Sequence, residues 1–84
     1  MAYNPYEAVK AIYNFKGQWD AANKSGDTIK KNNVARYAQD FYKQLRNNGY
    51  GNLADELDAV DYSGAKAIHD KWAKTGRTST RDYL

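Results

Sequence analysis

Histidine and carboxylate side chains are the residues of this chain best suited to acid–base or metal chemistry. His69 is the only histidine, and the chain has no cysteine. A zinc site or a catalytic triad needs a second imidazole or a convergent set of partner side chains, and the sequence offers neither around His69. We therefore expect His69 to be solvated or interfacial, and we predict no catalytic, metal or cofactor site.

Four acidic residues lie within seven positions in the second half of the chain: Asp55, Glu56, Asp58 and Asp61. Paired carboxylates catalyse acid–base reactions when burial raises the pKa of one of them. Helical periodicity instead places the first three on a side that faces water. The pattern favours a solvated acidic face over a weak metal or partner site.

A tyrosine between two glycines, Gly49-Tyr50-Gly51, is the most glycine-rich stretch. Neither a Lys-Ser/Thr pair nor a preceding strand accompanies it, so it resembles neither a P-loop nor a dinucleotide-binding fingerprint. The stretch predicts a turn between two helices. Tyr50 either folds back over the end of a helical hairpin or is exposed as a candidate partner contact.

Basic residues gather in two clusters, which are Lys30, Lys31 and Arg36 in the first half and Lys71, Lys74, Arg77 and Arg81 near the end. The segment 53–72 has the outline of a helix-turn-helix, but no glycine follows Leu57 where that motif normally turns. Asp61 and Asp70 would also place negative charge beside phosphates. A small nucleic-acid-binding helical module is therefore the alternative function. Its candidate contacts are Lys66, Lys71 and Lys74.

The length and composition of the chain limit the kinds of fold that can hold these residues. Eighty-four residues form one small domain with one core, and the net charge of +3 is a slight basic excess. Eight Tyr, two Trp and two Phe supply much of the apolar mass. Because Tyr and Trp carry polar atoms that need partners, such a core lies near the surface or is shared with a neighbouring chain. No apolar run approaches the roughly 18 residues of a membrane span, so we expect no membrane partner.

Two long helices are predicted first. Asn4 is a suitable N-cap and Pro5 a suitable first helical residue. The stretch 25–27 has the chemistry of a break, with Gly26 closing one helix and Asp27 capping the next, which runs from about position 28 to 47. Such a short connection predicts an antiparallel hairpin. Gly17 lies inside the first helix, which we expect to be continuous, and marks either a close approach by a neighbour or a weak point.

Two shorter helices follow. Asn52 is the predicted N-cap of the third helix, and either Asp61 or Ser63 caps the fourth, which Gly76 ends. We find no strand-like alternation, so the predicted fold is all-α, a bundle of four helices made of the hairpin and two shorter helices. The predicted core consists of Ile12, Phe15, Trp19, Val34, Ala38, Phe41, Leu45, Leu53, Leu57, Ile68 and Trp72.

The last residues do not fit one small core. We assign 1–76 to a single helical domain and 77–84 to a C-terminal tail. Ser79-Thr80-Arg81-Asp82 has the pattern of a capping box, so the tail is either the start of a helix in a longer protein or an ordinary frayed end. A further alternative is docking of the tail on the aromatic surface of this domain or of another copy. Its candidate partner contacts are Arg77, Arg81 and Tyr83.

Two stretches carry a family resemblance: 37–57, with its Asn47-Asn48-Gly49-Tyr50 turn, and 71–84, with its Ala73-Lys74-Thr75-Gly76 ending. They resemble small helical segments in structural proteins of tailed bacteriophages and prophages of Gram-positive bacteria. The resemblance implies a non-enzymatic structural or protein-interaction module of a virion or tail assembly, located in the virion or the host cytoplasm. Its partners would be copies of itself or the rest of a longer phage polypeptide.

Overall fold

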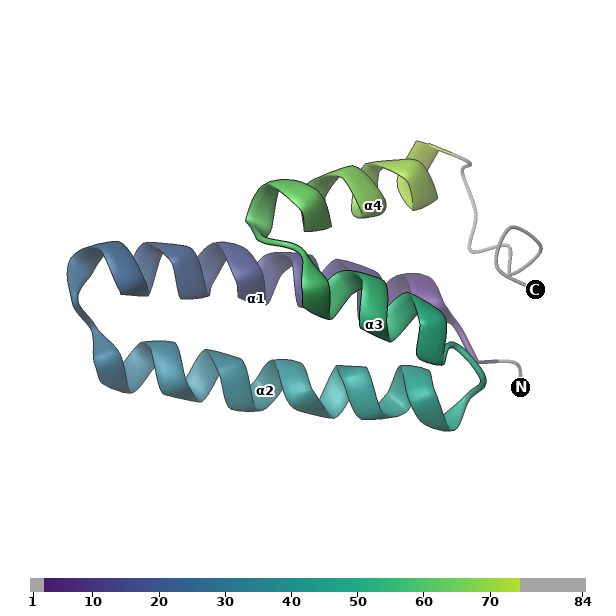
Figure 1. Cartoon of the computed structure of the whole chain (residues 1–84), viewed down its shortest axis with the longest axis horizontal. Coiled ribbons are helices and arrows are strands. Elements are labelled where there is room, and N and C mark those ends of the chain that lie inside the picture. The colour runs from purple at the N-terminus through teal and green to yellow at the C-terminus, as the bar shows by residue number, and fades with distance from the viewer. Residues whose placement is uncertain (1–2, 75–84) are drawn as a thin grey trace.

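The computed structural model describes residues 3–74, and within them the chain folds into four α-helices without a strand. The helices are α1 (Pro5–Ser25), α2 (Thr28–Asn47), α3 (Gly51–Ala59) and α4 (Tyr62–Lys74). Figure 1 shows the long α1–α2 hairpin with the two shorter helices packed along it. The prediction of an all-α bundle, with two long and two short helices, is confirmed.

Local capping chemistry sets the bounds of the hairpin as predicted. The Asn4 side chain accepts a hydrogen bond from the backbone N–H of Tyr6, and Pro5 opens α1. At the other end, Gly26 has φ 77°, the left-handed conformation that glycine adopts without steric cost. The Asp27 side chain then accepts from the backbone N–H of Lys30 and caps α2. Two residues therefore suffice to reverse the chain.

The start of α3 differs from the prediction. The helix begins at Gly51, with Tyr50 in the N-cap position and without a side-chain cap, so the assignment of Asn52 as N-cap is wrong. The reason is the tightness of the preceding turn. Gly49 is left-handed at φ 87°, and the N–H of Tyr50 donates back to the carbonyl of Leu45 at 2.8 Å. Asn52 already has helical backbone when that turn is complete.

The turn between α3 and α4 depends on Asp61 and Gly64. Of the two predicted caps for α4, the structure selects Asp61, whose Oδ1 accepts from the Gly64 N–H at 3.0 Å. A Cβ on residue 64 would come within 2.5 Å of the Val60 Cβ, so only glycine fits this close approach. The predicted end of α4 at Gly76 and the boundary between 76 and 77 lie outside the described residues.

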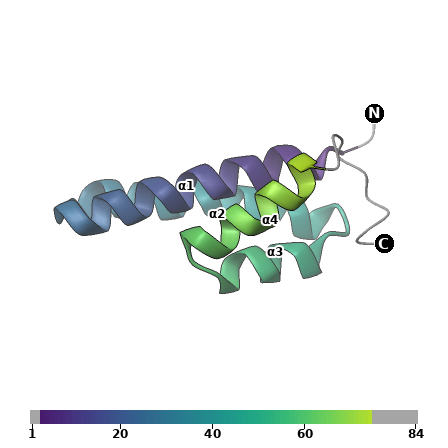
Figure 2. The same cartoon turned by 90° about the horizontal axis from the view of Figure 1, so that it is seen from above.

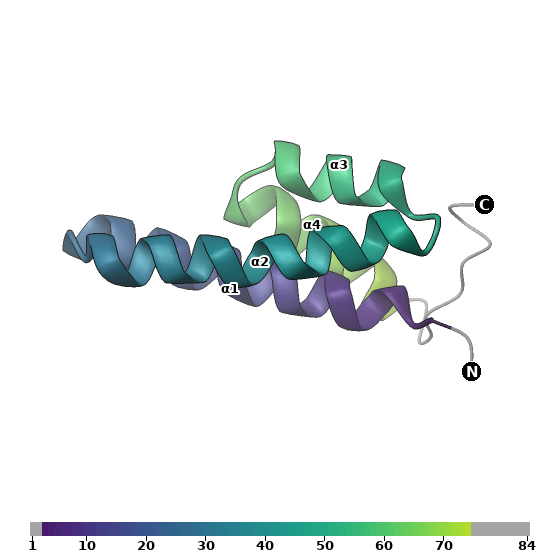
Figure 3. The ribbon, with the colours of Figure 1, turned by 90° about the horizontal axis from the view of Figure 1, so that it is seen from below.

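The two short helices cover only part of the hairpin. α4 packs mainly on α1, and α3 packs mainly on α2. Figures 1 and 2 show that the closed end of the hairpin, with the α1–α2 turn, projects beyond the α3–α4 pair. Figure 3, seen from below, shows α3 on the outer side of the pair, beside α2. Within residues 3–74, no third helix covers the projecting end.

The core is largely the predicted one. Eight of the predicted core residues are buried: Ile12, Val34, Ala38, Leu45, Leu53, Leu57, Ile68 and Trp72. Phe15 and Phe41 are half-buried against this core. Trp19 is wrongly placed by the prediction, because its side chain is 39% exposed on the projecting end of the hairpin. Tyr42, by contrast, is buried although the prediction did not place it in the core.

Candidate functional site

A pocket opens where the α3–α4 turn meets the long hairpin. Its volume is about 340 Å³. We call it the hairpin pocket. Three separate parts of the chain line it, and they are Phe15, Lys16, Trp19 and Asp20 of α1, then Val34, Ala35, Ala38, Gln39 and Tyr42 of α2, and then Asp58, Val60, Asp61 and Tyr62 around the α3–α4 turn.

The hairpin pocket has a buried floor and aromatic walls. Val34, Ala38 and Tyr42 are buried and form the floor. Trp19 and Tyr62 are among the most exposed large apolar side chains of the described residues, at 39% and 36%. Exposed aromatic side chains on a pre-formed framework are typical of protein-binding surfaces.

The wall at Tyr62 is held by close packing against α1. A Cβ on Gly17 would lie 2.8 Å from Tyr62 Cε1, so the absence of a side chain at position 17 lets the ring reach α1. This confirms the expectation that Gly17 marks a close approach. Tyr62 also stacks on Tyr13, with ring centroids 5.2 Å apart and an angle of 4° between the rings.

Three of the four charged side chains that line the hairpin pocket are acidic, and two further ammonium groups, those of Lys24 and Lys31, lie next to lining residues. Asp58 and Asp61 are exposed, and Asp20 is half-buried with only a loose 3.8 Å contact to Lys24. The single basic group of the lining, the Lys16 ammonium, donates to the Val60 carbonyl at 2.7 Å and so links α1 to the α3–α4 turn. A mainly acidic rim thus lies on a chain whose net charge is +3.

The pKa of the Tyr42 hydroxyl is raised by its surroundings in the hairpin pocket. Burial, and then the negative charge of Asp58, raise the pKa of Tyr42 from 10.0 to about 12. Tyr42 therefore stays neutral at every physiological pH and acts as a fixed part of the floor.

A second, shallower hollow lies on the other flank of the projecting hairpin. Its volume is about 390 Å³, and it shares Phe15 and Val34 with the hairpin pocket. Positions 30, 33 and 37 of α2 line it, and helical periodicity places them on the flank opposite Ala35 and Gln39. Ile29 and Tyr37 are exposed there at 76% and 55%. Apolar side chains are therefore exposed on both flanks of the hairpin end.

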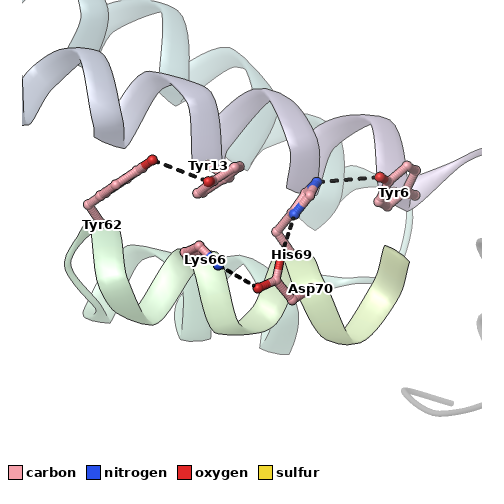
Figure 4. Close-up of polar contacts among 6 residues, drawn as sticks. All are labelled: Tyr6, Tyr13, Tyr62, Lys66, His69 and Asp70. Carbon is pink, nitrogen blue, oxygen red and sulfur yellow. Dashed lines mark hydrogen bonds and ion pairs between the residues drawn. The ribbon is translucent and has the colours of Figure 1, made fainter. Parts of the chain in front are cut away.

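A stack of three tyrosines and His69 joins α1 to α4 (Figure 4). His69 stacks on Tyr13, with centroids 4.6 Å apart, and on Tyr6 at 5.7 Å. Its Nε2 lies 3.4 Å from the Tyr6 hydroxyl, and its Nδ1 lies 3.2 Å from Asp70 Oδ1. His69 thus lies at the interface between α1 and α4. Neither pocket described above is lined by His69, so we assign this Asp70–His69–Tyr6 chain of contacts to the packing of α4 on α1.

This stack was not predicted from the sequence, although the spacing of its residues indicates it. Tyr6 and Tyr13 are seven residues apart on α1, and Tyr62 and His69 are seven residues apart on α4. Residues at that spacing lie on one face of a helix, two turns apart. Because the two helices run antiparallel, Tyr6 meets His69 and Tyr13 meets Tyr62.

The predicted site residues do not converge. Tyr50 is half-buried and its ring lies 5.9 Å from that of Tyr3, so it folds back on the helical domain. Lys66 pairs with Asp70 at 2.9 Å, and this contact raises the pKa of Lys66 and lowers that of Asp70. Lys71 is exposed and five positions further on, roughly 140° around the helix from Lys66. The side chains of Lys74, Arg77, Arg81 and Tyr83 lie outside what the structure describes.

The acidic cluster is solvated, as the sequence pattern favours. Asp55, Glu56, Asp58 and Asp61 are all exposed. They act separately, since Asp55 pairs with Arg46 at 2.7 Å and Asp61 caps α4. Across residues 3–74, no three His, Cys, Asp or Glu side chains come together in an arrangement that could hold a metal ion.

No helix in the described part of the chain combines the length and the apolar composition needed to cross a membrane. In comparisons with protein-family models, with curated proteins and with solved structures, nothing matched this chain.

Proposed function

We propose that this domain is a non-enzymatic protein-interaction module that binds a segment of another protein in the hairpin pocket. The observation that carries the proposal is that two exposed aromatic side chains, Trp19 and Tyr62, line one pocket with a buried apolar floor. Binding energy in protein interfaces concentrates in such aromatic anchors, above all in Trp and Tyr.

Rigidity of the framework supports the proposal. Ala38 and Tyr42 of the floor belong to the hydrophobic core cluster. The Lys16–Val60 hydrogen bond and the Gly17–Tyr62 contact both join α1 to the α3–α4 turn. A partner that enters such a pocket does not have to order it first, and pre-organisation of this kind increases affinity.

The chemistry of the rim supports a binding role over a catalytic one. Acid–base catalysis by a carboxyl group needs a pKa shifted towards neutrality, which burial provides. Asp58 and Asp61 are exposed, and Asp61 has a structural task as the cap of α4. We therefore propose a role for these groups in recognising a partner.

The biological setting that we propose is a virion or tail assembly of a phage-like particle. It rests on the sequence resemblance in 37–57 and 71–84. Immunogold labelling of particles from the source strain with an antibody against this chain tests the setting. Labelled particles support it, and purified particles without label contradict it.

The experiment that tests the binding function is a selection of random displayed peptides on the immobilised full chain. We expect enriched peptides to bind Trp19→Ala at least roughly tenfold more weakly than the wild type, because this change removes one wall of the hairpin pocket. Ile29→Ala is the matched control, since Ile29 is also an exposed apolar residue of the projecting hairpin but does not line this pocket. Peptides that bind Trp19→Ala as tightly as the wild type would contradict the proposed site.

A further inference from the structure

We infer that the hairpin pocket takes a cationic anchor, the guanidinium or ammonium group of an arginine or lysine side chain in the bound segment. The inference rests on the proposed function and specifies the chemistry of the partner. It follows from the charge, the aromatic walls and the size of the hairpin pocket.

Charge complementarity is the first argument. Three of the four charged side chains that line the hairpin pocket are aspartates, and the fourth is Lys16. The pocket is therefore acidic on a chain with a net charge of +3, so its sign is opposite to that of the molecule as a whole. A basic segment is attracted to this position and repelled by much of the remaining surface.

The carboxylates are available to a ligand. Among the described residues, Asp58 and Asp61 form no ion pair, and the cap to Gly64 engages only Oδ1 of Asp61. The Lys16 ammonium is directed at the Val60 carbonyl, where it donates its 2.7 Å hydrogen bond. Two carboxylates near one apolar opening provide acceptors for the several N–H donors of a guanidinium group.

The negative charge of the rim also affects a group inside the hairpin pocket. Asp58 contributes to the raised pKa of the Tyr42 hydroxyl, which belongs to the buried floor. The field of Asp58 therefore extends inward, where screening by water is weaker than at the open surface.

The aromatic walls suit the same ligand. The Trp19 ring has one cation–π contact within the chain, with the Lys31 ammonium 5.4 Å from its centroid. The methylene stem of an arginine or lysine side chain would pack against these aromatic lining residues while its charged end meets the rim. A volume of about 340 Å³ is large enough for one such side chain and its backbone.

The test uses two probes of nearly the same shape, one with a charged guanidinium group and one with a neutral ureido group. Nα-acetyl-arginine N-methylamide presents one arginine between two peptide groups, and its citrulline counterpart has nearly the same shape without the charge. Both are titrated into the ¹⁵N-labelled full chain. We expect the arginine probe to shift the Trp19 indole N–H and the Val60 and Tyr62 amides, with an affinity at least roughly fivefold higher than that of the citrulline probe.

Variants then test whether the carboxylates of the rim cause the preference for the arginine probe. Asp58→Asn with Asp61→Asn removes both charges, and asparagine at 61 keeps an oxygen that can cap α4. We expect the double variant to bind both probes equally. Glu56→Gln is the matched control, because Glu56 is an exposed carboxylate of α3 that does not line the hairpin pocket, and it should keep the wild-type preference.

Each remaining outcome overturns the inference. Equal binding of both probes to the wild type would show that the charge of the anchor does not contribute to binding. This result would not contradict the proposed binding of a protein segment in the hairpin pocket. Absence of any shift with the arginine probe would also overturn the cationic anchor, whereas the docking function is judged separately by the peptide selection. Shifts at the same residues that depend on protein concentration alone would identify the occupant as a second copy of the chain.

Discussion

The ring of Tyr62 lies against α1 at Gly17, and a Cβ at that position would come within 2.8 Å of the ring. This contact fixes one wall of the hairpin pocket and allows the nearly parallel stack of Tyr62 on Tyr13. A helix-interior glycine normally costs up to about 1 kcal/mol relative to alanine. Here the glycine serves the packing of α4 on α1.

We expect Gly17→Ala to displace the Tyr62 ring and to lower the free energy of unfolding, because the lost packing outweighs the gain in helix propensity. In a Tyr62→Ala background the clash is absent, so the same change should raise stability by roughly 0.5–1 kcal/mol. Chemical denaturation of the four proteins of this double-mutant cycle measures the coupling. Equal effects of Gly17→Ala in both backgrounds would show that the contact does not constrain position 17.

Core substitutions should follow the observed burial. Leu57 is fully buried, and Leu57→Ala should cost about 2–5 kcal/mol, a large part of the stability of so small a domain. Phe41 is only half-buried, so Phe41→Ala should cost less than the typical value for a central phenylalanine. Urea denaturation compares them, and a larger loss for Phe41→Ala would contradict this ranking.

The capping of the long helices could be predicted from the sequence, whereas the exposure of Trp19 could not. Asn4, Gly26 and Asp27 act within a few residues of themselves, so short sequence patterns report them. Trp19 lies on the apolar stripe of α1, as periodicity requires, but its burial depends on how far α3 and α4 extend over the hairpin. That coverage is a property of tertiary packing.

The hairpin pocket is made by three parts of the chain that are distant in sequence. Lys16 of α1, Ala38 of α2 and Asp61 of the α3–α4 turn become neighbours of one cavity only after folding. Sequence patterns predicted Asp58 on a solvated face and Asp61 as one of two possible caps of the fourth helix, but could not place both in one pocket with Trp19. The local role of each residue could be predicted from the sequence, whereas the pocket depends on how the helices pack together.

Alkaline pH should destabilise the domain through Tyr42. Its pKa rises from 10.0 to about 12 in the folded chain, so the unfolded state loses the proton first as the pH rises. The stability from this group is present below pH 10.0 and is lost as the pH approaches about 12. Burial also raises the pKa of Tyr3 in the same direction.

Tyr42→Phe isolates this contribution. We expect the variant to lose less of its free energy of unfolding than the wild type between pH 10.0 and about 12, because it lacks the buried ionisable hydroxyl. Denaturation at several pH values measures both slopes, with the Tyr37→Phe variant as a control for an exposed tyrosine. Identical slopes for the wild type and Tyr42→Phe would show that Tyr42 does not cause the alkaline loss.

Nucleic-acid binding separates the alternative function from the proposed one. We expect no specific binding to duplex DNA at physiological salt, because Lys66 is paired with Asp70 and is directed away from Lys71 around the helix. Fluorescence anisotropy with labelled DNA at increasing salt checks this. A sub-micromolar complex that Lys71→Ala weakens would reverse the ranking of the two functions.

Docking in the hairpin pocket is the central claim, and amide shift mapping with a selected peptide tests it most directly. The ¹⁵N-labelled full chain is titrated with the most strongly enriched peptide. We predict that the largest shifts surround the hairpin pocket, at the Trp19 indole N–H, Ala35, Val60 and Tyr62. Shifts centred on the Tyr3–Tyr50 end of the bundle or on the exposed face of α4, with Trp19 unchanged, would contradict the account.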